Sequence, residues 1–110
     1  MKTRLLTILV ACVVLSACAG TLQTASMSEA YKQYHKGNFE KTLTLITQAE
    51  NARPMDEDQR ARMTYLKART YAELGDFEMA SVLYTYLLDQ HADSQYAYLA
   101  REAMAAREPS

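Results

Sequence analysis

Residues 71–80 constrain the fold of this chain more than any other stretch, because they have the pattern of a corner between two antiparallel helices. Gly75 lacks a Cβ and can adopt the positive φ that ends a helix. Asp76 follows with a carboxylate that can accept the free N–H groups of the next helix, and Phe77 begins a new apolar stripe. A weaker copy, Gly-Asn-Phe-Glu, lies at residues 37–40. Two copies of one helical corner suggest a repeat protein.

The amino end has the pattern of a secretory signal. Lys2 and Arg4 supply positive charge, and residues 5–15 form an apolar run. At a rise of about 1.5 Å per residue this run is shorter than the ~30 Å hydrocarbon core of a bilayer. The sequence therefore predicts a removable signal peptide at residues 1–17 and not an ordinary membrane span.

The cleavage region is Leu-Ser-Ala-Cys at residues 15–18, which resembles the lipobox of bacterial lipoproteins. The resemblance implies cleavage between Ala17 and Cys18 and a diacylglycerol thioether on Cys18, with a further acyl chain on its amine in many bacteria. Ala19 follows where an Asp would retain the protein, so the resemblance implies sorting to the outer membrane, with the domain facing the periplasm. The alternative is an ordinary secretory signal in which Cys18 is coincidental.

Charge and cysteine content restrict the function of the mature chain. Removal of 17 of the 110 residues leaves 93, with 10 basic and 13 acidic side chains and a net charge of about −3. Because the basic residues form no cluster, nucleic-acid binding is not expected. Cys12 leaves with the signal and Cys18 carries the lipid, so no thiol remains for a disulfide or for a cysteine nucleophile.

The remaining chain predicts an all-α domain at residues 26–107, preceded by a flexible, lipidated tether at residues 18–25 and followed by a frayed tail at residues 108–110. Five helices are expected: residues 27–36, a second after residue 38 that the Arg53-Pro54 pair ends, a third at about residues 57–74, a fourth after the Gly75 corner that residues 91–93 interrupt, and a fifth that runs to about residue 107. Their expected caps are Ser26 paired with Glu29, Asn38, Asp56, Asp76, and either Asp93 or Ser94. The expected inward residues are Ala30, Tyr31, Tyr34, Phe39, Leu43, Ile46, Ala49, Met63, Leu66, Thr70, Tyr71, Leu74, Phe77, Ala80, Leu83, Tyr84, Leu87, Leu88, Ala97, Ala100 and Met104.

The second corner and its flanks resemble a tetratricopeptide repeat. The residues that carry the resemblance are Ala68, Tyr71, Gly75, Phe77, Ala80, Tyr84 and Leu87. In that family a small residue on the first helix of a repeat meets a small residue on the second, so that the two backbones approach closely. The resemblance assigns these places to Ala68 and Ala80, and the large packing positions to Tyr71 and Tyr84. Ala92 stands where the family usually has a proline.

The first copy matches less well. Its matching residues are Ala30, Gly37, Phe39, Ile46, Ala49 and Pro54. Thr42 stands at the place of Ala80, and Gln33 at the place of Tyr71. The two glycines are 38 residues apart against a family period of 34, and a longer third helix would absorb the extra turn. The resemblance implies two repeats and a carboxy-terminal capping helix, and the alternative is a generic helical bundle.

The register of such repeats implies a binding groove on the concave side, lined by the first helix of each pair. The implied groove residues are Tyr31, Tyr34, His35, Arg62, Tyr65, Arg69 and Glu73, with Met27 and Ala72 beside them. Aromatic and Arg side chains supply much of the energy at protein interfaces, so a peptide or helix could bind across them. The alternative is that the tyrosines pack against neighbouring helices and keep only their hydroxyls in water.

Other chemistry has little support in the sequence. A second aromatic group consists of Tyr84, Tyr86, Tyr96 and Tyr98, most of them expected to be core or ordinary surface. Tyr84 is expected in the core and Tyr86 on the outer side of its helix, and Tyr96 and Tyr98 either pack or dock a partner. His35 and His91 are far apart in sequence, and no metal site, cofactor or catalytic motif is expected.

The expected function is that of an outer-membrane lipoprotein that acts as a protein-binding adaptor in a cell-envelope complex. One alternative is a pilotin-like chaperone for a secretin or pilus subunit. Another is a self-associating structural lipoprotein that pairs through its open amino-terminal helices, because two repeats make a short array.

Overall fold

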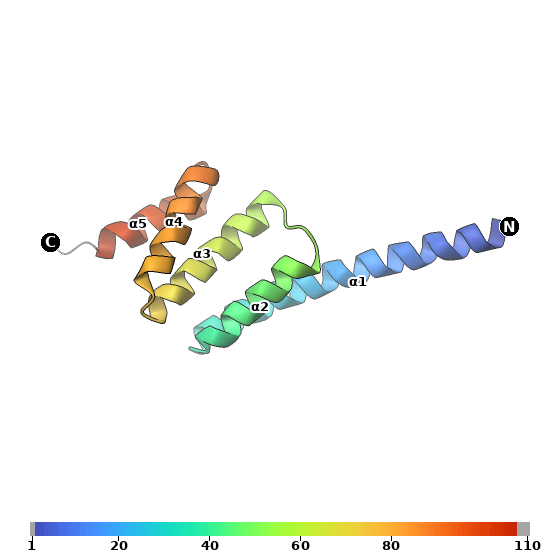
Figure 1. Cartoon of the computed structure of the whole chain (residues 1–110), viewed down its shortest axis with the longest axis horizontal. Coiled ribbons are helices and arrows are strands. Elements are labelled where there is room, and N and C mark those ends of the chain that lie inside the picture. The colour runs from blue at the N-terminus through green and yellow to red at the C-terminus, as the bar shows by residue number, and fades with distance from the viewer. Residues whose placement is uncertain (1, 108–110) are drawn as a thin grey trace.

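The computed structural model describes the backbone of residues 2–107 and the side chains of those residues except 15 and 16. Five helices follow one another: α1 (Lys2–His35), α2 (Phe39–Ala52), α3 (Glu57–Glu73), α4 (Phe77–Gln90) and α5 (Gln95–Arg107) (Figure 1). Residues 2–107 contain no strand, so the all-α prediction is confirmed. The expected fraying of residues 108–110 lies outside the described residues.

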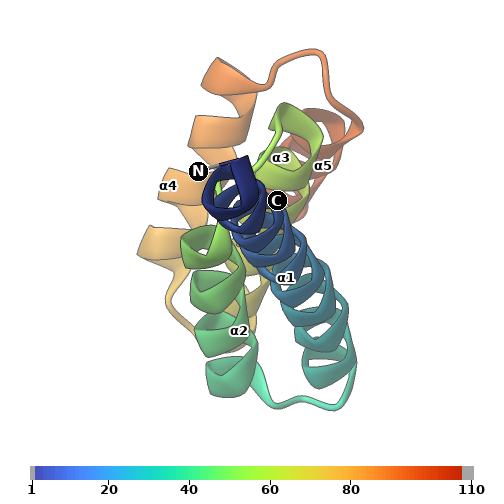
Figure 2. The ribbon, with the colours of Figure 1, turned by 90° about the vertical axis from the view of Figure 1, so that its right-hand side faces the viewer.

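The helices form two hairpins and a final single helix. α1 packs against α2, α3 packs against α4, and α5 packs against α4 and α3. Figure 2 shows α2 and α4 on one side of the molecule, α1 and α5 on the other, and α3 between them. The molecule measures 72 × 30 × 18 Å, and its long dimension comes from the amino-terminal half of α1, which projects from the domain as an arm (Figure 1).

The two corners share one backbone geometry. Gly37 and Gly75 have φ of 81° and 82°, as the corner prediction required. In each corner the residue after the glycine donates its N–H to the carbonyl five residues earlier, at 2.9 Å. Each glycine N–H also bonds to the carbonyl three residues earlier, at 3.0 Å. This pair of bonds satisfies the last carbonyls of the preceding helix, and it needs a residue that tolerates positive φ.

The two corners differ in how the following helix begins. Asp76 accepts a hydrogen bond from the Met79 N–H at 3.1 Å, so its predicted capping role is confirmed. Asn38 makes no capping bond, which corrects the prediction for that residue. Its amide nitrogen instead donates to Gln33 Oε1 at 2.7 Å, because Gln33 occupies the place that Tyr71 occupies in the second copy.

Small residues lie at the contact between the helices of each hairpin. Ala68 and Ala80 are both fully buried, in the core cluster shared by α3, α4 and α5. Ala30 and Thr42 are fully buried at the corresponding positions of the first hairpin. The Thr42 hydroxyl is satisfied within its own helix, because it donates to the Asn38 carbonyl at 2.9 Å. Small side chains at these positions let the paired backbones lie close together.

The expected tether at residues 18–25 is helical, and that prediction is wrong. α1 runs through these residues without a break, and Ser26, the expected cap, lies inside the helix and is buried. The segment contains no proline, and a single glycine costs a helix only about 1 kcal/mol. Gln23 is 2% exposed, and its amide nitrogen donates to the Ala49 and Arg53 carbonyls at 3.1 and 2.8 Å. Gln23 therefore satisfies carbonyls at the end of α2, a role that fixes this part of α1 to the domain.

Two residues expected in the core lie on the surface. Leu74 is 43% exposed because it is the C-cap of α3, where the chain turns away from the hairpin contact. Phe77 is 49% exposed as the first residue of α4, and the Arg107 guanidinium lies 3.9 Å from its ring centroid. The predicted caps of the other helices hold: Asp56 forms a full capping box with Gln59, and Ser94 Oγ accepts from the Ala97 N–H.

Candidate partner-binding face

Three helices, α1, α3 and α5, bring tyrosine and arginine side chains close to one another. α1 and α5 lie on the same side of α3 (Figure 2). α1 contributes two tyrosines three residues apart, α3 contributes residues at spacings of three and four, and α5 contributes one tyrosine near its start. We call this set the tyrosine face, and it consists of Tyr31, Tyr34, Arg62, Tyr65, Arg69 and Tyr96. The helical spacing explains why the members of α1 and of α3 share a side of their helices.

Arg69 links the first hairpin to the second. Its guanidinium carbon lies 5.2 Å from the ring centroid of Tyr34 and 5.8 Å from that of Tyr65. Both distances are within the range of cation–π attraction. Arg69 is exposed and forms no ion pair within residues 2–107. The two rings therefore hold its position while its charge stays accessible to a partner.

Tyr65 is the centre of an aromatic row. Its ring centroid lies 5.9 Å from that of Tyr96 on α5 and 6.2 Å from that of Tyr84 on α4. Tyr84 is buried below in the second core cluster, so the row begins in the core and ends at the surface. Aromatic rings at these separations attract one another beyond the effect of burying their area, and this attraction helps to hold the rings in place.

Arg62 has a different electrostatic environment from Arg69. Its Nη2 lies 2.6 Å from Asp58 Oδ2, one helical turn earlier, and this carboxylate raises the pKa of the guanidinium. The Arg62 Nε is buried and has no hydrogen-bond partner among the described residues. Because Asp58 compensates the charge of Arg62, the main uncompensated positive charge on the face belongs to Arg69.

Burial raises the pKa of both tyrosines that α1 contributes to the face. Desolvation raises the pKa of Tyr31 to about 12, with a smaller contribution from neighbouring Tyr96. Desolvation also raises the pKa of Tyr34, against the lowering effect of the nearby Arg69. At physiological pH these groups act as neutral hydrogen-bond donors and acceptors beside one accessible cation. The arrangement has the chemistry of a binding surface for polar and aromatic groups.

The structure brings together five of the seven residues expected in the groove: Tyr31, Tyr34, Arg62, Tyr65 and Arg69. Tyr34 is only 9% exposed and belongs to the first core cluster, so the packing alternative holds for this residue. His35 is exposed, and its ring meets the Tyr34 ring edge-on at 5.6 Å. Glu73 is exposed and acts on Tyr34 electrostatically, which places it at the margin of the face. Met27 is core, and Ala72 packs against the second cluster.

Tyr96 is the one residue of the face that the repeat register does not place in the groove. The sequence groups it with the other aromatic residues of the last two helices and leaves open whether it packs or docks a partner, and Tyr86 and Tyr98 of that group are exposed. Only the return of α5 against α3 brings Tyr96 to Tyr65. The helix-start signal at Ser94 fixes where α5 begins, but no local pattern fixes the helix on which it packs.

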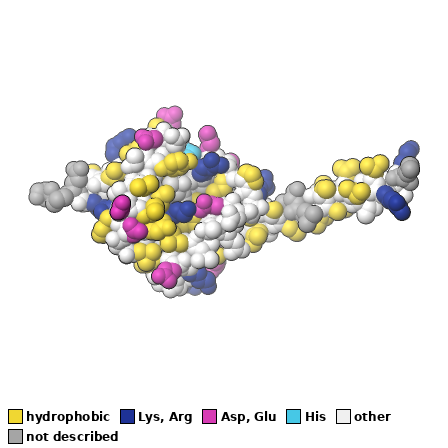
Figure 3. Space-filling model, viewed as in Figure 1, with side chains coloured by type: hydrophobic (Ala, Val, Ile, Leu, Met, Phe, Trp, Pro, Cys, Tyr) yellow, Lys and Arg dark blue, Asp and Glu magenta, His cyan; other side chains and the backbone are white. Residues whose placement is uncertain are grey.

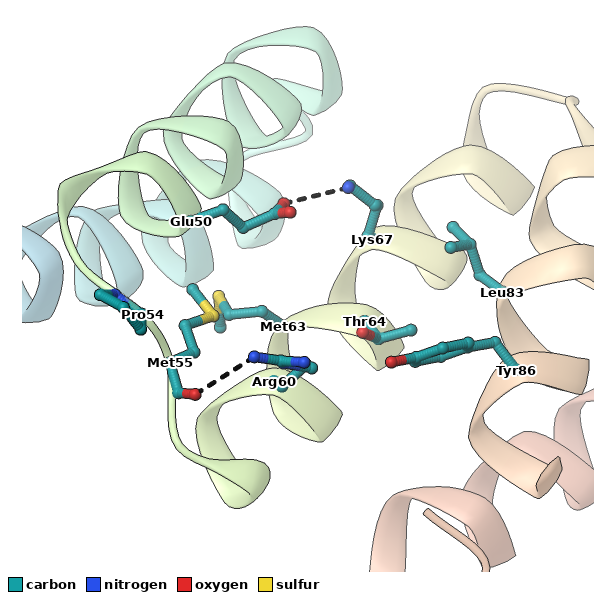
Figure 4. Close-up of a pocket in the computed structure, with 9 residues that line it drawn as sticks. All are labelled: Glu50, Pro54, Met55, Arg60, Met63, Thr64, Lys67, Leu83 and Tyr86. Atoms are coloured by element: carbon teal, nitrogen blue, oxygen red, sulfur yellow. Dashed lines mark hydrogen bonds and ion pairs between the residues drawn. The ribbon is translucent and has the colours of Figure 1, made fainter. Parts of the chain in front are cut away.

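A hollow of about 390 Å³ lies on the other side of α3, between α2 and α4. Figure 4 shows the residues that line it, and we call it the α2–α4 groove. The lining residues are Glu50, Pro54, Met55, Arg60, Met63, Thr64, Lys67, Leu83 and Tyr86. An ion pair of 3.0 Å between Lys67 and Glu50 crosses it, and Arg60 donates to the Met55 carbonyl at its end.

Metal chemistry and similarity to known proteins add no further assignment. Residues 2–107 contain no group of three or more His, Cys, Asp or Glu side chains that could hold a metal ion. Comparisons with protein-family models, with curated proteins and with solved structures find no match. The case for a function therefore depends on the tyrosine face and on α1.

Proposed function

We propose that this protein is a lipoprotein of the bacterial outer membrane whose helical domain binds a segment of a cell-envelope protein through the tyrosine face. The observation that carries the proposal is the convergence of α1, α3 and α5 on Arg69 and Tyr65. Tyr and Arg are enriched among residues that dominate interface energies, and here they are pre-positioned by ring contacts. Pre-positioned side chains lose little entropy when a partner binds.

The amino-terminal arm supports membrane attachment. The large apolar side chains between residues 5 and 14 are exposed on the projecting part of α1, where Figure 3 shows hydrophobic side chains on its surface. α1 is the one helix among the described residues that is long and apolar enough to cross a membrane, and a signal sequence near the N-terminus has the same properties. Exposed Cys18 lies at the base of the arm, within the Leu-Ser-Ala-Cys motif. Two or three acyl chains on this residue would anchor the domain durably.

The position of the anchor sets the distance between domain and bilayer. Cys18 is five residues before buried Gln23, so the lipid would lie only about 7.5 Å along α1 from the first residue fixed to α2. Such a short helical connection would hold the domain against the membrane surface. A partner on the same membrane would then meet the tyrosine face at high local concentration.

The shared geometry of the two corners supports the interpretation of the domain as a tetratricopeptide-like array. The same hydrogen bonds and the same positive φ recur at Gly37 and Gly75, and small buried residues recur at the helix contacts. The first helices of successive pairs, α1, α3 and α5, also contact one another in order. In such an array these helices line the surface that binds an extended peptide or a helix.

The proposal is tested by removing the centre of the face, which consists of half-buried Tyr65 and exposed Arg69. We expect Tyr65→Ala with Arg69→Ala to abolish co-purification of the envelope partner from cross-linked cells without loss of helical circular dichroism. The matched control is Tyr98→Ala with Arg101→Ala, which removes the same side-chain types from exposed positions on α5. Equal recovery of the partner by both double variants and the unaltered chain would refute the binding role of the face.

A further inference from the structure

The surface of α4 carries an apolar stripe that the core does not use. Met79, Val82 and Tyr86 are 40%, 58% and 37% exposed, and their spacing of three and four residues places them on one side of the helix. Leu83 continues the stripe into the α2–α4 groove. Figure 3 shows hydrophobic side chains gathered on this face of the domain. It lies across α3 from the tyrosine face, because α2 and α4 are on the opposite side from α1 and α5 (Figure 2).

The first hairpin shows that the fold does not require this stripe. Counted from the corner glycine, the positions of Met79, Val82 and Tyr86 correspond to Lys41, Thr44 and Gln48 on α2. All three are exposed and polar or charged. The same helical corner and the same kind of helix contact therefore form with a polar surface at these positions. The apolar character of α4 needs an explanation outside the packing of the single chain.

The two edges of the stripe carry opposite charges. On the side of α3, Arg60 and Lys67 line the groove next to Leu83. At about 100° per residue around the axis of α4, Glu78 and Asp89 lie about 40° and 20° from Val82, on the side of Val82 away from Leu83. Arg60, Glu78 and Asp89 form no ion pairs within residues 2–107. The face therefore has a basic edge and an acidic edge. On the basic edge Lys67 is paired with Glu50 at 3.0 Å and Arg60 remains available to another molecule, and on the acidic edge Glu78 and Asp89 remain available.

We propose that the occupant of this face is a second copy of the same chain, with α4 packed on α4 about a two-fold axis that runs along the stripe. Such an axis brings the apolar stripe of one copy onto that of the other. It also places the acidic edge of each copy over the basic edge of its partner. A second copy supplies both the apolar stripe and the complementary charges that this face requires. Both copies then use the same surface for the contact, which is the arrangement of an isologous interface.

The dimer extends the proposed function without depending on it. Because the tyrosine face lies on the opposite side of the domain, pairing through α4 leaves it open in both copies. The assembly then displays two binding faces and two anchors. Two linked sites bind a multivalent partner far more tightly than one site, with no new contact required.

Disulfide trapping tests the interface in the full-length chain in its native membrane. On the proposed axis Val82 lies opposite its own copy, so Val82→Cys should form a disulfide-linked dimer on mild oxidation, seen on a non-reducing gel. Thr44→Cys is the matched control at the corresponding position of α2. Both variants share Cys12 and Cys18, so the control reports any background from chains that retain the signal or lack the lipid. We expect the dimer band for position 82 and a monomer for position 44.

A second pair of variants tests the apolar stripe itself. Adding Tyr86→Glu to Val82→Cys should lower the dimer yield at least about tenfold, because it places a charge in the apolar contact. Adding Gln48→Glu, the matched change on α2, should leave the yield unchanged. The proposal is overturned by equal cross-linking at positions 82 and 44, by a position-82 adduct with a different polypeptide only, or by a dimer that Tyr86→Glu does not weaken. None of these results depends on the tyrosine face, so failure here is distinct from failure of the adaptor function.

Discussion

The three glycines of the chain should respond in opposite directions to the same substitution. Gly75 has φ of 82°, and a Cβ added there would meet no atom within 4 Å. Gly75→Ala therefore costs only the backbone strain of a left-handed alanine, about 1 kcal/mol of unfolding free energy. Gly37→Ala should cost the same, because its φ is 81° and its surroundings are equally open.

Gly20→Ala provides the contrast. Gly20 lies inside α1, where alanine is favoured over glycine by about 1 kcal/mol. Its added Cβ would meet Arg53 Nη1 at 3.0 Å, which is the end of a flexible side chain and can move. We therefore expect Gly20→Ala to leave stability unchanged or to raise it, although its Cβ meets the closest neighbour of the three.

Urea unfolding followed by circular dichroism at 222 nm, in mild detergent, measures these differences. For a domain of this size about 1 kcal/mol corresponds to a midpoint about 0.5–1 M lower in urea. Both corner variants should show this shift with unchanged slope, and Gly20→Ala should not. An unchanged midpoint for Gly75→Ala, or an equal loss for Gly20→Ala, would refute the assignment of the corners.

Three further predictions concern the anchor, α1 and the buried tyrosines. Cys18→Ala should abolish incorporation of labelled palmitate and leave the chain with its signal attached, whereas Cys12→Ala should still be labelled and processed. Gln23→Leu should lower the free energy of unfolding by about 1–3 kcal/mol, measured by the same urea assay, because it removes both donors to carbonyls at the end of α2. Burial raises the pKa of Tyr31 and of Tyr84 to about 12, so the unfolded chain loses these protons at lower pH than the folded chain does. The contribution of these two tyrosines to the free energy of unfolding should be fully present below pH 10 and should be lost between pH 10 and 12. The loss should be on the order of 1 kcal/mol for each group after allowance for solvent screening. Ultraviolet difference spectra should show directly that the two hydroxyls ionise at high pH.

Local patterns sufficed to predict most helix boundaries and caps. The corner at Gly75 needs a residue that tolerates positive φ and a carboxylate that caps the next helix. The sequence shows both directly, as Gly75 and Asp76. The tether was mispredicted because small polar residues indicate flexibility only when nothing packs on them. Gln23 becomes structural through bonds to residues 26 and 30 positions later, and no local window contains that information.

The candidate site likewise combines residues that a local pattern indicates with a residue that only tertiary packing brings to it. The register of a tetratricopeptide-like repeat implies Tyr31, Tyr65 and Arg69 as groove residues, and the spacing within α1 and α3 keeps the members of each helix on one side of it. Tyr96 joins them only through the packing of α5 against α3, which depends on the whole arrangement. The spacing within α4 does not single out the exposed stripe of Met79 and Val82, because a helix with apolar residues on two sides does not reveal which side has a partner.

Photo-cross-linking in intact cells tests the central claim of a binding face most directly. A photoreactive amino acid at position 31, on the partly exposed margin of the tyrosine face, should form an adduct with one envelope protein. The same group at position 98, exposed on α5 away from the face, should not form it. Adding Arg69→Ala should remove the adduct at position 31 without changing the level of the protein. No adduct at position 31, or the same adducts at both positions, would contradict the account.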